Sequence, residues 1–497
     1  MTDSYDLLVI GGGVNGAGIA RDAAGRGMSV CLVEMGDLAQ ATSSASTKLI
    51  HGGLRYLEHG EIRLVRESLI ERERLLAMAP HIIWPLRFVL PHDKGLRPRW
   101  LLRLGLFLYD NIGGRKVLPP TRTVDLRTPP HHDVLKDRLV TGFEYSDCWV
   151  EDARLVVLNA VDARERGADI RTRTRCTTLT RTGDGWQAQL QADDSECTVS
   201  ARMVVNAAGP WVDDVLGRAI PGAEHANLRL VKGSHLIFPR LFGADTAYIF
   251  QNSDNRIVFA IPYEGEFTLV GTTDVGFDGD PSSIAISEAE ARYICDAINE
   301  YLRLEVTPEQ AVSSYSGVRP LYDDRSADNS TVTRDYVFEL DRGAAGDEAA
   351  ILSIFGGKIT TYRKLAEHAL TKLGAPGKGW TASAPLPGGD FGGETIASLA
   401  ARFAAVNDTL PASVIMRMAR AYGTRTEQII GSVQRPHTLG EEVAPGLFEA
   451  ELAYLVECEF ACSAEDVLWR RSKLGLHFAP DQCASVERWF ARRGADS

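Results

Sequence analysis

The feature that most constrains this fold lies within the first 34 residues, where a strand, a glycine-rich turn, a helix and a second strand follow directly. Residues 5–10 are apolar and β-rich, and GGGVNG at 11–16 matches G-x-G-x-x-G. A helical stretch follows over 14–26, and a second apolar strand over 28–33 ends at Glu34. This order predicts an α/β domain that binds a dinucleotide at the strand–helix turn.

Each part of this motif has a physical role. Gly11 permits the tight turn, Gly13 lets the backbone approach a pyrophosphate, and Gly16 lets the helix pack closely on the strand. The helix N-terminus offers free N–H groups to the phosphates. Glu34 stands where a carboxylate accepts both ribose hydroxyls, which disfavours NADP and leaves FAD and NAD open. The alternative, a glycine-rich turn without a ligand, is disfavoured by the complete order of elements.

Length and composition are those of an ordinary globular enzyme. A chain of 497 residues accommodates two or three domains. The net charge of −12 argues against a general nucleic-acid binder. We expect no transmembrane helix, because no apolar run reaches roughly 18 residues, and no signal peptide. The eight cysteines form no C-x-x-C pair, so we expect reduced thiols in a cytosolic protein, and we find no metal motif.

The order of elements changes along the chain. After the early α/β stretch, an apolar strand at 203–208 returns the chain to the nucleotide domain. Short strands predict a mostly antiparallel second sheet, at 234–238, 247–250, 256–262, 267–270 and 331–340. A buried strand at 351–355, the turn Gly356-Gly357-Lys358 and a helix to 373 then repeat the first motif, so a second helix N-terminus is expected to face the cofactor. Beyond a Gly/Pro-rich join at 385–393 the pattern is helical.

Several dense motifs coincide in this chain. They lie at 43–57, 147–154, 232–235, 271–274, 315–320, 355–363 and 468–471. Together they closely resemble the FAD-dependent, aerobic glycerol-3-phosphate dehydrogenases over nearly the whole chain. The resemblance implies a Rossmann-like FAD-binding domain of the glycine-oxidase (D-amino-acid-oxidase) type, an antiparallel substrate domain and a C-terminal helical domain. It further implies FAD as the cofactor, oxidation of sn-glycerol 3-phosphate to dihydroxyacetone phosphate, and electron delivery to membrane quinone.

These observations predict a discontinuous domain organisation. We expect the FAD-binding domain at 1–80, 145–225 and 345–385, a membrane-facing insertion at 81–144, the substrate domain at 226–344 and a helical domain at 394–497.

The substrate implied by the resemblance is a phosphate dianion with a secondary alcohol. His235 is the best candidate for the base, since imidazole titrates near neutral pH, although a structural strand histidine is the alternative. Arg319, expected at the end of an element, can offer a bidentate fork to phosphate, and Arg55 and Lys358 are further cations for the catalytic site. Their alternative role is solvated surface charge. Tyr56 is expected to contact the substrate as well. Thr272 is expected to contact the substrate, and the alternatives are a contact with the flavin or a turn cap.

A second set of residues is expected to bind the cofactor. The set consists of Gly11, Gly13, Asn15, Gly16, Glu34, Ser43, Ser44, Thr47, Lys48, Gly209, Gly356, Gly357 and Thr360. In the family that this chain resembles, the segment containing Ser43, Ser44, Thr47 and Lys48 runs along the flavin. The alternative is a serine-rich loop.

One segment, at 96–116, is both basic and apolar. It contains Arg97, Arg99, Arg103, Arg115 and Lys116 together with Trp100, Leu101, Leu104, Phe107 and Leu108. Such a segment suits a helix lying in a lipid headgroup interface, which predicts a cytoplasmic enzyme held peripherally on the inner face of the cytoplasmic membrane. A buried helix with flanking arginines is the alternative. A homodimer is compatible with the sequence.

Two other functions fit parts of this pattern. The first is an FAD-dependent oxidase or dehydrogenase of an amino acid or hydroxy acid, which would use arginine to bind a carboxylate. The second is a non-catalytic flavin-binding scaffold on a membrane, which would have no need for His235 together with three cations. Three cationic candidates favour the phosphate dianion.

Overall fold

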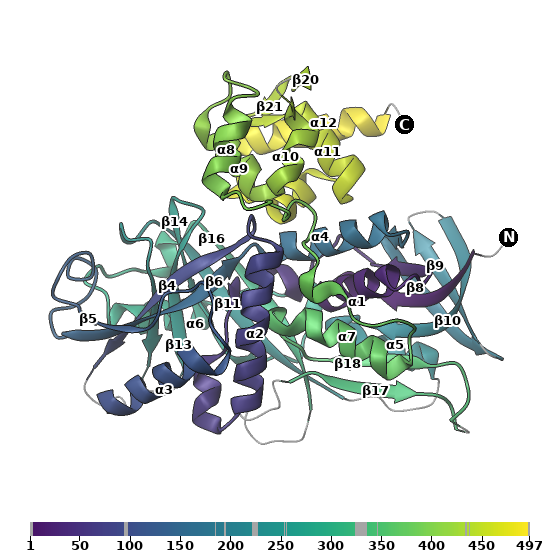
Figure 1. Ribbon diagram of the computed structural model, residues 1–497, viewed down its shortest axis with the longest axis horizontal. Coiled ribbons are helices and arrows are strands. Elements are labelled where there is room, and N and C mark those ends of the chain that lie inside the picture. The colour runs from purple at the N-terminus through teal and green to yellow at the C-terminus, as the bar shows by residue number, and fades with distance from the viewer. Residues whose placement is uncertain are drawn as a thin grey trace.

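The computed structural model describes residues 3–93, 98–183, 185–192, 195–220, 227–252, 254, 256–323, 335–344, 346–432, 435–436 and 438–495. Two units, each built on a sheet, lie side by side, and a helical domain covers their junction (Figure 1). Leu96 and Arg97 of the basic segment, and residues 331–334 of an expected strand, lie outside the described residues.

The first sheet carries the glycine motif. Its path of strands is β17 (Val337–Asp341), β18 (Ile351–Phe355), β10 (Ser195–Asn206), β1 (Asp3–Ile10), β2 (Val30–Val33) and β7 (Asp169–Arg171). From β18 to β7 all neighbours are parallel, and β8 (Thr174–Thr182) and β9 (Gly185–Ala192) extend β10 antiparallel. Strands buried on both faces read as apolar runs, which is why LLVI in β1 and VCLV in β2 were recognisable in the sequence.

Helices cover one face of this sheet. They are α1 (Val14–Gly25), α4 (Asp152–Glu165) and α7 (Tyr362–Leu373), whose small alanine-rich faces share a core with β1 and β2. The other face packs against β8, β9 and α5 (Val212–Ala219). This three-layer arrangement brings the N-termini of α1 and α7 to the carboxyl ends of β1 and β18.

The second sheet is mostly antiparallel. Its path is β15 (Val275–Gly276), β11 (Leu228–Pro239), β14 (Phe267–Gly271), β13 (Ile257–Tyr263), β12 (Ala247–Gln251), β4 (Ile83–His92), β6 (Thr141–Val150) and β3 (Leu49–Ile50). At its sides, β16 (Ser313–Tyr322) pairs with β11 and β5 (Arg122–Asp125) pairs with β6. One face packs on α6 (Glu288–Asn299), and the other packs on α2 (Ile62–Met78) and α3 (Arg99–Ile112).

Three expectations need correction. The strand expected at 331–340 does not join the second sheet: its described part, β17, pairs antiparallel with β18 in the first. β6 starts before residue 145 and belongs to the second sheet, although 145–225 was assigned to the FAD-binding domain. Arg319 lies within β16, where Gly317 is extended rather than turning. Strand pairing decides all three, and local composition does not encode which strands pair.

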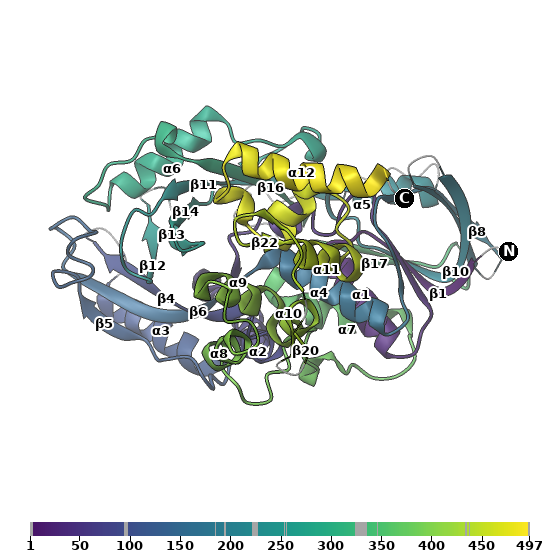
Figure 2. The same ribbon diagram turned by 90° about the horizontal axis from the view of Figure 1, so that it is seen from above.

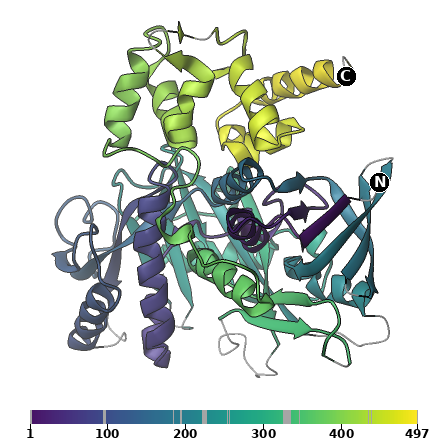
Figure 3. The same ribbon diagram turned by 45° about the vertical axis from the view of Figure 1, so that its right-hand side comes forward.

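The C-terminal domain has its own core and rests on α4 (Figures 2 and 3). Its helices are α8 (Ile396–Ala404), α9 (Ala412–Tyr422), α10 (Thr426–Ile430), α11 (Glu449–Glu459) and α12 (Pro480–Ala495), with a π-helical turn at Asp466–Arg471. Short strand pairs join β19 (Gly431–Ser432) to β20 (Arg435–Pro436), and β21 (Glu442–Ala444) to β22 (Leu447–Phe448). The helical character expected for this region is therefore confirmed.

Candidate active site

A long cavity of about 790 Å³ runs along the carboxyl edge of the first sheet. This volume falls within the roughly 300–1,000 Å³ that is usual for cofactor sites. Nine of the residues expected to bind the cofactor line it, namely Gly11, Gly13, Asn15, Glu34, Ser43, Ser44, Gly209, Gly356 and Gly357. The cavity thus joins both glycine turns, as the repeated strand–turn–helix motif predicts.

The first glycine turn leaves no room for side chains. A Cβ on Gly11 would lie 2.4 Å from the carbonyl oxygen of Ala207, and one on Gly16 would lie 1.9 Å from that of Gly11. Gly16 therefore packs the helix on the strand and does not line the cavity. Ser43 Oγ accepts a hydrogen bond of 3.0 Å from Val14 N–H at the start of α1.

Two polar side chains of the cavity suit a dinucleotide. The carboxylate of Glu34 accepts the N–H of Gly12 at 2.6 Å and of Gly36 at 2.9 Å, while burial raises its pKa. Asn15 donates to the carbonyl of Gly356 at 3.2 Å, and its own carbonyl oxygen is buried without a hydrogen-bond partner among the described residues. Asn15 thus ties α1 to the second glycine turn and leaves an acceptor for a ligand. The residues present fit an FAD.

Besides Gly16, three expected cofactor residues lie outside this wall. Thr360 exchanges hydrogen bonds with the backbone of His51, and Thr47 Oγ1 lies 3.0 Å from Nε2 of His235. Lys48 is buried, and its ammonium donates to both carboxylate oxygens of Asp152 at 2.9 Å. The charge of Lys48 therefore holds the loop against α4 rather than facing the cavity.

A second cavity, of about 320 Å³, collects most of the residues expected to bind substrate. Its wall includes Arg55, Tyr56, Thr272 and Arg319. Lys358 is not part of this wall, but its ammonium lies 3.9 Å from the centre of the Tyr56 ring. The structure therefore brings the three cations together from segments that are far apart in the sequence.

The pairing of β11 with β16 explains how Arg319 reaches this place. On one face of the pair, Arg319 stands opposite Val231, Gly317 opposite Gly233, and Tyr315 opposite His235. Gly233 leaves space on this face: a Cβ there would lie 2.7 Å from Thr272 Oγ1 and 3.3 Å from Nη2 of Arg319. Nη2 of Arg319 donates to the carbonyl of Thr273 at 3.1 Å and lies 3.3 Å from Asp274.

The two cavities adjoin along β16. Arg319 lines the smaller cavity, whereas its chain neighbours Val318 and Pro320, with Gly317 and Tyr315, line the larger one. A single strand thus contributes to both cavities, with Arg319 in the smaller one.

His235 lies close to both cavities but lines neither. Its ring stacks on Tyr315 with centroids 4.7 Å apart, and its Nδ1 has no hydrogen-bond partner among the described residues. Burial, reinforced by the charges of Lys48 and Arg319, lowers the pKa of His235 to about 3. The imidazole is therefore neutral near pH 7, and its lowered pKa makes it a weaker base than a free histidine.

Two functional candidates were not recognised from the sequence. His51 lines the cationic cavity, and burial lowers its pKa. Asp147 lines it too, accepting hydrogen bonds from Arg72 and from the hydroxyl of Tyr109, which itself accepts the N–H of Gly52. Both residues lie within the motifs at 43–57 and 147–154, which resemble the family. No other feature of the sequence pointed to them.

The helix α3 contributes an apolar wall to the cationic cavity and an apolar face to solvent. Leu106 and Tyr109 are buried, whereas Trp100 is 68% exposed and Phe107 63% exposed. Leu101, Leu104 and Leu108 are also exposed and line the cavity mouth. Among the described residues, no helix is both long enough and apolar enough to cross a membrane.

Comparison with known proteins agrees with this geometry. Residues 6–363 match the family described as FAD dependent oxidoreductase, and residues 380–489 match the C-terminal domain of alpha-glycerophosphate oxidase. The chain is 49% identical to D-erythritol 1-phosphate dehydrogenase of Brucella abortus over 98% of both chains. It is 50% identical to glycerol-3-phosphate dehydrogenase of Pseudomonas aeruginosa, over 97% of this chain and 94% of that one.

The fold and the site define an FAD-dependent oxidoreductase. Within that class, the chain belongs to the family of FAD-dependent glycerol-3-phosphate dehydrogenases. The resemblance inferred from the motifs is confirmed, and FAD, one of two dinucleotides that the motif left open, is the cofactor.

Solved structures support the fold class. The glycerol-3-phosphate dehydrogenase of Bacillus halodurans complexed with FAD superposes with a TM-score of 0.77 at 28% identity, over 99% of this chain and 91% of that one. Glycine oxidase of Geobacillus kaustophilus, at 19% identity, gives 0.52 over 78% of this chain and 99% of that one, and shows the fold alone. The expected glycine-oxidase type of FAD-binding fold is thus confirmed.

Proposed function

We propose that this enzyme oxidises sn-glycerol 3-phosphate to dihydroxyacetone phosphate and passes the electrons to membrane quinone. The observation that carries the proposal is that β16 lines both a cationic cavity and an FAD-sized cavity. Arg55, Arg319 and Lys358 can neutralise a phosphate dianion, and an arginine can hold two phosphate oxygens at once. A carboxylate substrate would need fewer cations, which disfavours an amino acid or hydroxy acid.

The side chains around β16 suit removal of a hydroxyl proton. When bound, FAD supplies the acceptor for the hydride that leaves the alcohol carbon. His235 accepts the hydroxyl proton in this proposal, and Thr47 Oγ1 at 3.0 Å fixes the orientation of its ring. Tyr56 and Thr272 position the polyol in the cavity, which also includes the buried His51.

A second substrate has a specific observation in its favour. The Brucella abortus relative that is 49% identical over nearly both whole chains is named for D-erythritol 1-phosphate. Its name differs from that of the Pseudomonas aeruginosa relative, although the two are about equally similar to this chain. A cavity of about 320 Å³ does not select between a three-carbon and a four-carbon polyol phosphate by size. Measuring kcat/KM for both compounds with one preparation decides between them.

The membrane part of the proposal rests on α3. Its apolar face carries Trp100 and Phe107, and the exposed Arg99 and Arg103 on the same helix suit anionic headgroups. An enzyme seated in this way on the inner face of the cytoplasmic membrane would present the cavity mouth, lined by Leu101, Leu104 and Leu108, to the lipid that contains quinone. A homodimer is compatible with this placement, and light scattering of the detergent-free enzyme tests it.

Flavin absorbance tests the core of the proposal. Anaerobic addition of sn-glycerol 3-phosphate should bleach the yellow enzyme, and a soluble quinone should restore the colour. An enzyme that keeps its absorbance with FAD bound would exclude this substrate, and bleaching by amino or hydroxy acids would replace it.

A further inference from the structure

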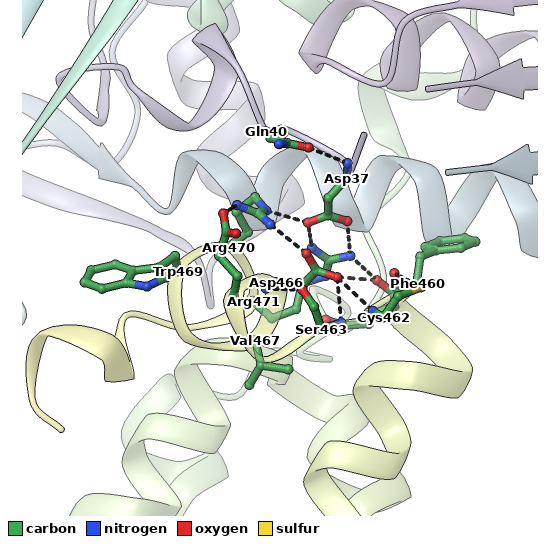
Figure 4. A network of polar contacts seen from close by, with 12 residues as sticks. Asp37, Gln40, Phe460, Cys462, Ser463, Asp466, Val467, Trp469, Arg470 and Arg471 are labelled. Carbon is green, nitrogen blue, oxygen red and sulfur yellow. Dashed lines mark hydrogen bonds and ion pairs between the residues drawn. The ribbon is translucent and has the colours of Figure 1, made fainter. Parts of the chain in front are cut away.

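The loop that follows β2 forms one wall of the cofactor cavity. Within 34–40, five residues line that cavity, namely Glu34, Met35, Gly36, Ala39 and Gln40. Asp37 belongs to the same loop but does not line the cavity, and only 1% of it is exposed. Its side chain contacts the C-terminal domain, as Figure 4 shows. Asp37 therefore lies at the back of the wall that carries the ribose-binding Glu34.

Two arginines of the C-terminal domain donate hydrogen bonds to the carboxylate of Asp37. Arg470 Nε donates to Asp37 Oδ2 at 2.5 Å, and Arg471 donates to both carboxylate oxygens, at 2.5 and 2.8 Å (Figure 4). Arg471 is fully buried and also donates to the backbone carbonyl of Glu459 at 2.8–2.9 Å. Because charged groups in a dry interior need partners, removing one member of such a set leaves the others uncompensated.

A second carboxylate, Asp466, extends the contact to the other side of the loop. It accepts hydrogen bonds of 2.6 Å from both Arg470 and Arg173. The backbone N–H of Arg173 in turn donates to the carbonyl of Gly36 at 2.8 Å. The loop is thus fixed by two connections, one through the side chain of Asp37 and one from the backbone of Gly36 through Arg173. Both connections lead to the π-helical turn at Asp466–Arg471.

We propose that the C-terminal helical domain strengthens FAD binding by fixing the loop that lines the cofactor cavity. Asp37, held by Arg470 and Arg471, is the positioning residue that couples the domain to FAD binding. The domain does not line the cavity; it fixes the loop that does. The inference depends on FAD as the cofactor and is independent of which polyol phosphate is oxidised.

The structure offers a matched control for this coupling. Arg154 on α4 donates to Glu459 on α11, and this buried ion pair also joins the C-terminal domain to the FAD-binding domain. Arg154 does not line the cofactor cavity. Breaking either pair should loosen the docking of the C-terminal domain, but only the Asp37 pair leads directly into the cavity wall.

The test compares Asp37→Asn with Arg154→Gln. Apoprotein of each variant is titrated with FAD, and the Kd is read from flavin fluorescence, beside the unfolding midpoint of the apoprotein. We expect Asp37→Asn to raise the Kd by about tenfold, within the range usual for coupled sites, and Arg154→Gln to leave it within about twofold. Both variants should lower the unfolding midpoint of the apoprotein.

Other outcomes overturn the proposal. An unchanged Kd for Asp37→Asn would show that the loop keeps its form without the contact. Equal weakening by Arg154→Gln would mean that docking of the domain matters and Asp37 does not. If Asp37→Asn does not fold, Arg471→Lys is tested in its place. This variant keeps the positive charge but loses the two parallel hydrogen bonds of the guanidinium. The proposal then requires the same rise in Kd, relative to Arg154→Gln.

Reciprocity supplies an independent readout. If the domain strengthens FAD binding, FAD must strengthen the docking of the domain by the same factor. Amide hydrogen exchange over 460–472 should slow by about tenfold when FAD is added to the apoprotein, and this protection should disappear in Asp37→Asn. An exchange rate over 460–472 that FAD does not change in the wild-type protein would contradict the coupling.

Discussion

His235 is the single residue on which the proposed chemistry depends most. It combines a buried neutral imidazole, a fixed ring orientation from Thr47 and Tyr315, and the nearby charge of Arg319. A histidine with a purely structural role would be buried in the same way. Only kinetic measurements therefore distinguish a catalytic base from a structural residue. Replacing it leaves the cofactor cavity intact because His235 does not line that cavity.

We therefore expect His235→Ala to slow reduction of the flavin by sn-glycerol 3-phosphate by about 10²- to 10⁴-fold, the usual contribution of a general base. The FAD content should stay unchanged. Stopped-flow absorbance measures the rate, and His477→Ala, at a partly exposed histidine of the C-terminal domain, is the control. Wild-type reduction rates in His235→Ala would remove it from the role of base.

Another buried histidine gives a pH prediction. Burial first, and then the charge of Arg154, lower the pKa of His81 to about 3. Between pH 3 and about 6.5 the unfolded chain binds a proton at this residue and the folded chain does not. Stability therefore rises with pH in this window and falls as pH drops from about 6.5, by about 1.4 kcal/mol per unit for this residue. Urea unfolding at pH 5.5 and 7 should show a smaller pH difference in His81→Gln, and an identical difference would contradict it.

At the level of elements, β11 and β16 build the substrate side of the site. Gly233 on β11 leaves the space into which Thr272 and Arg319 project, whereas Gly317 on β16 leaves space for Ala45. We expect Gly233→Ala to raise the KM for the phosphate substrate by about tenfold or more, since its Cβ would lie 2.7 Å from Thr272 Oγ1. FAD binding should remain unchanged.

Gly217→Ala is the control, since nothing lies within 4 Å of its added Cβ. An unchanged KM in Gly233→Ala would show that the substrate does not depend on this space.

The helix α3 is the element that carries the membrane proposal. Replacing Trp100 and Phe107 together by Ser should weaken binding to vesicles containing anionic lipid by about tenfold or more, because burying one such side chain contributes about 1.5–3 kcal/mol. Vesicle flotation measures the binding. Val312→Ser, at an apolar residue 53% exposed outside α3, should change nothing. Equal flotation of all three proteins would exclude α3 as the contact.

The sequence was most informative about elements whose pattern is local. The strand–glycine–helix motif placed β1, α1 and Glu34, and the basic apolar segment placed α3. Which strands pair is not predictable from local pattern, and for this reason the expectations for the sheet of β17 and for the position of Arg319 are wrong. Lys48 was taken for a cofactor ligand because its partner, Asp152, is about 100 residues away. Residue types identify chemistry, whereas tertiary contacts decide which side chains face a cavity.

At the level of the whole molecule, three parts meet around one reaction centre. The first sheet supplies the cofactor cavity and Lys358, the second supplies Arg319, and the turn after β3 supplies Arg55. The C-terminal domain holds the loop behind Glu34. Figure 3 shows the helical domain over the junction of the two units. We infer that this arrangement brings the substrate and flavin sites close to the proposed membrane contact, with the apolar cavity mouth at α3 as the side facing lipid.

The most direct measurement is anaerobic mixing of the yellow enzyme with sn-glycerol 3-phosphate and, separately, with D-erythritol 1-phosphate, while flavin absorbance is followed. The adjacent cationic and cofactor cavities predict rapid bleaching by sn-glycerol 3-phosphate that a soluble quinone reverses. Bleaching by the erythritol phosphate alone would keep the chemistry but change the substrate. Absorbance that neither compound alters, with FAD still bound, would contradict a polyol-phosphate dehydrogenase.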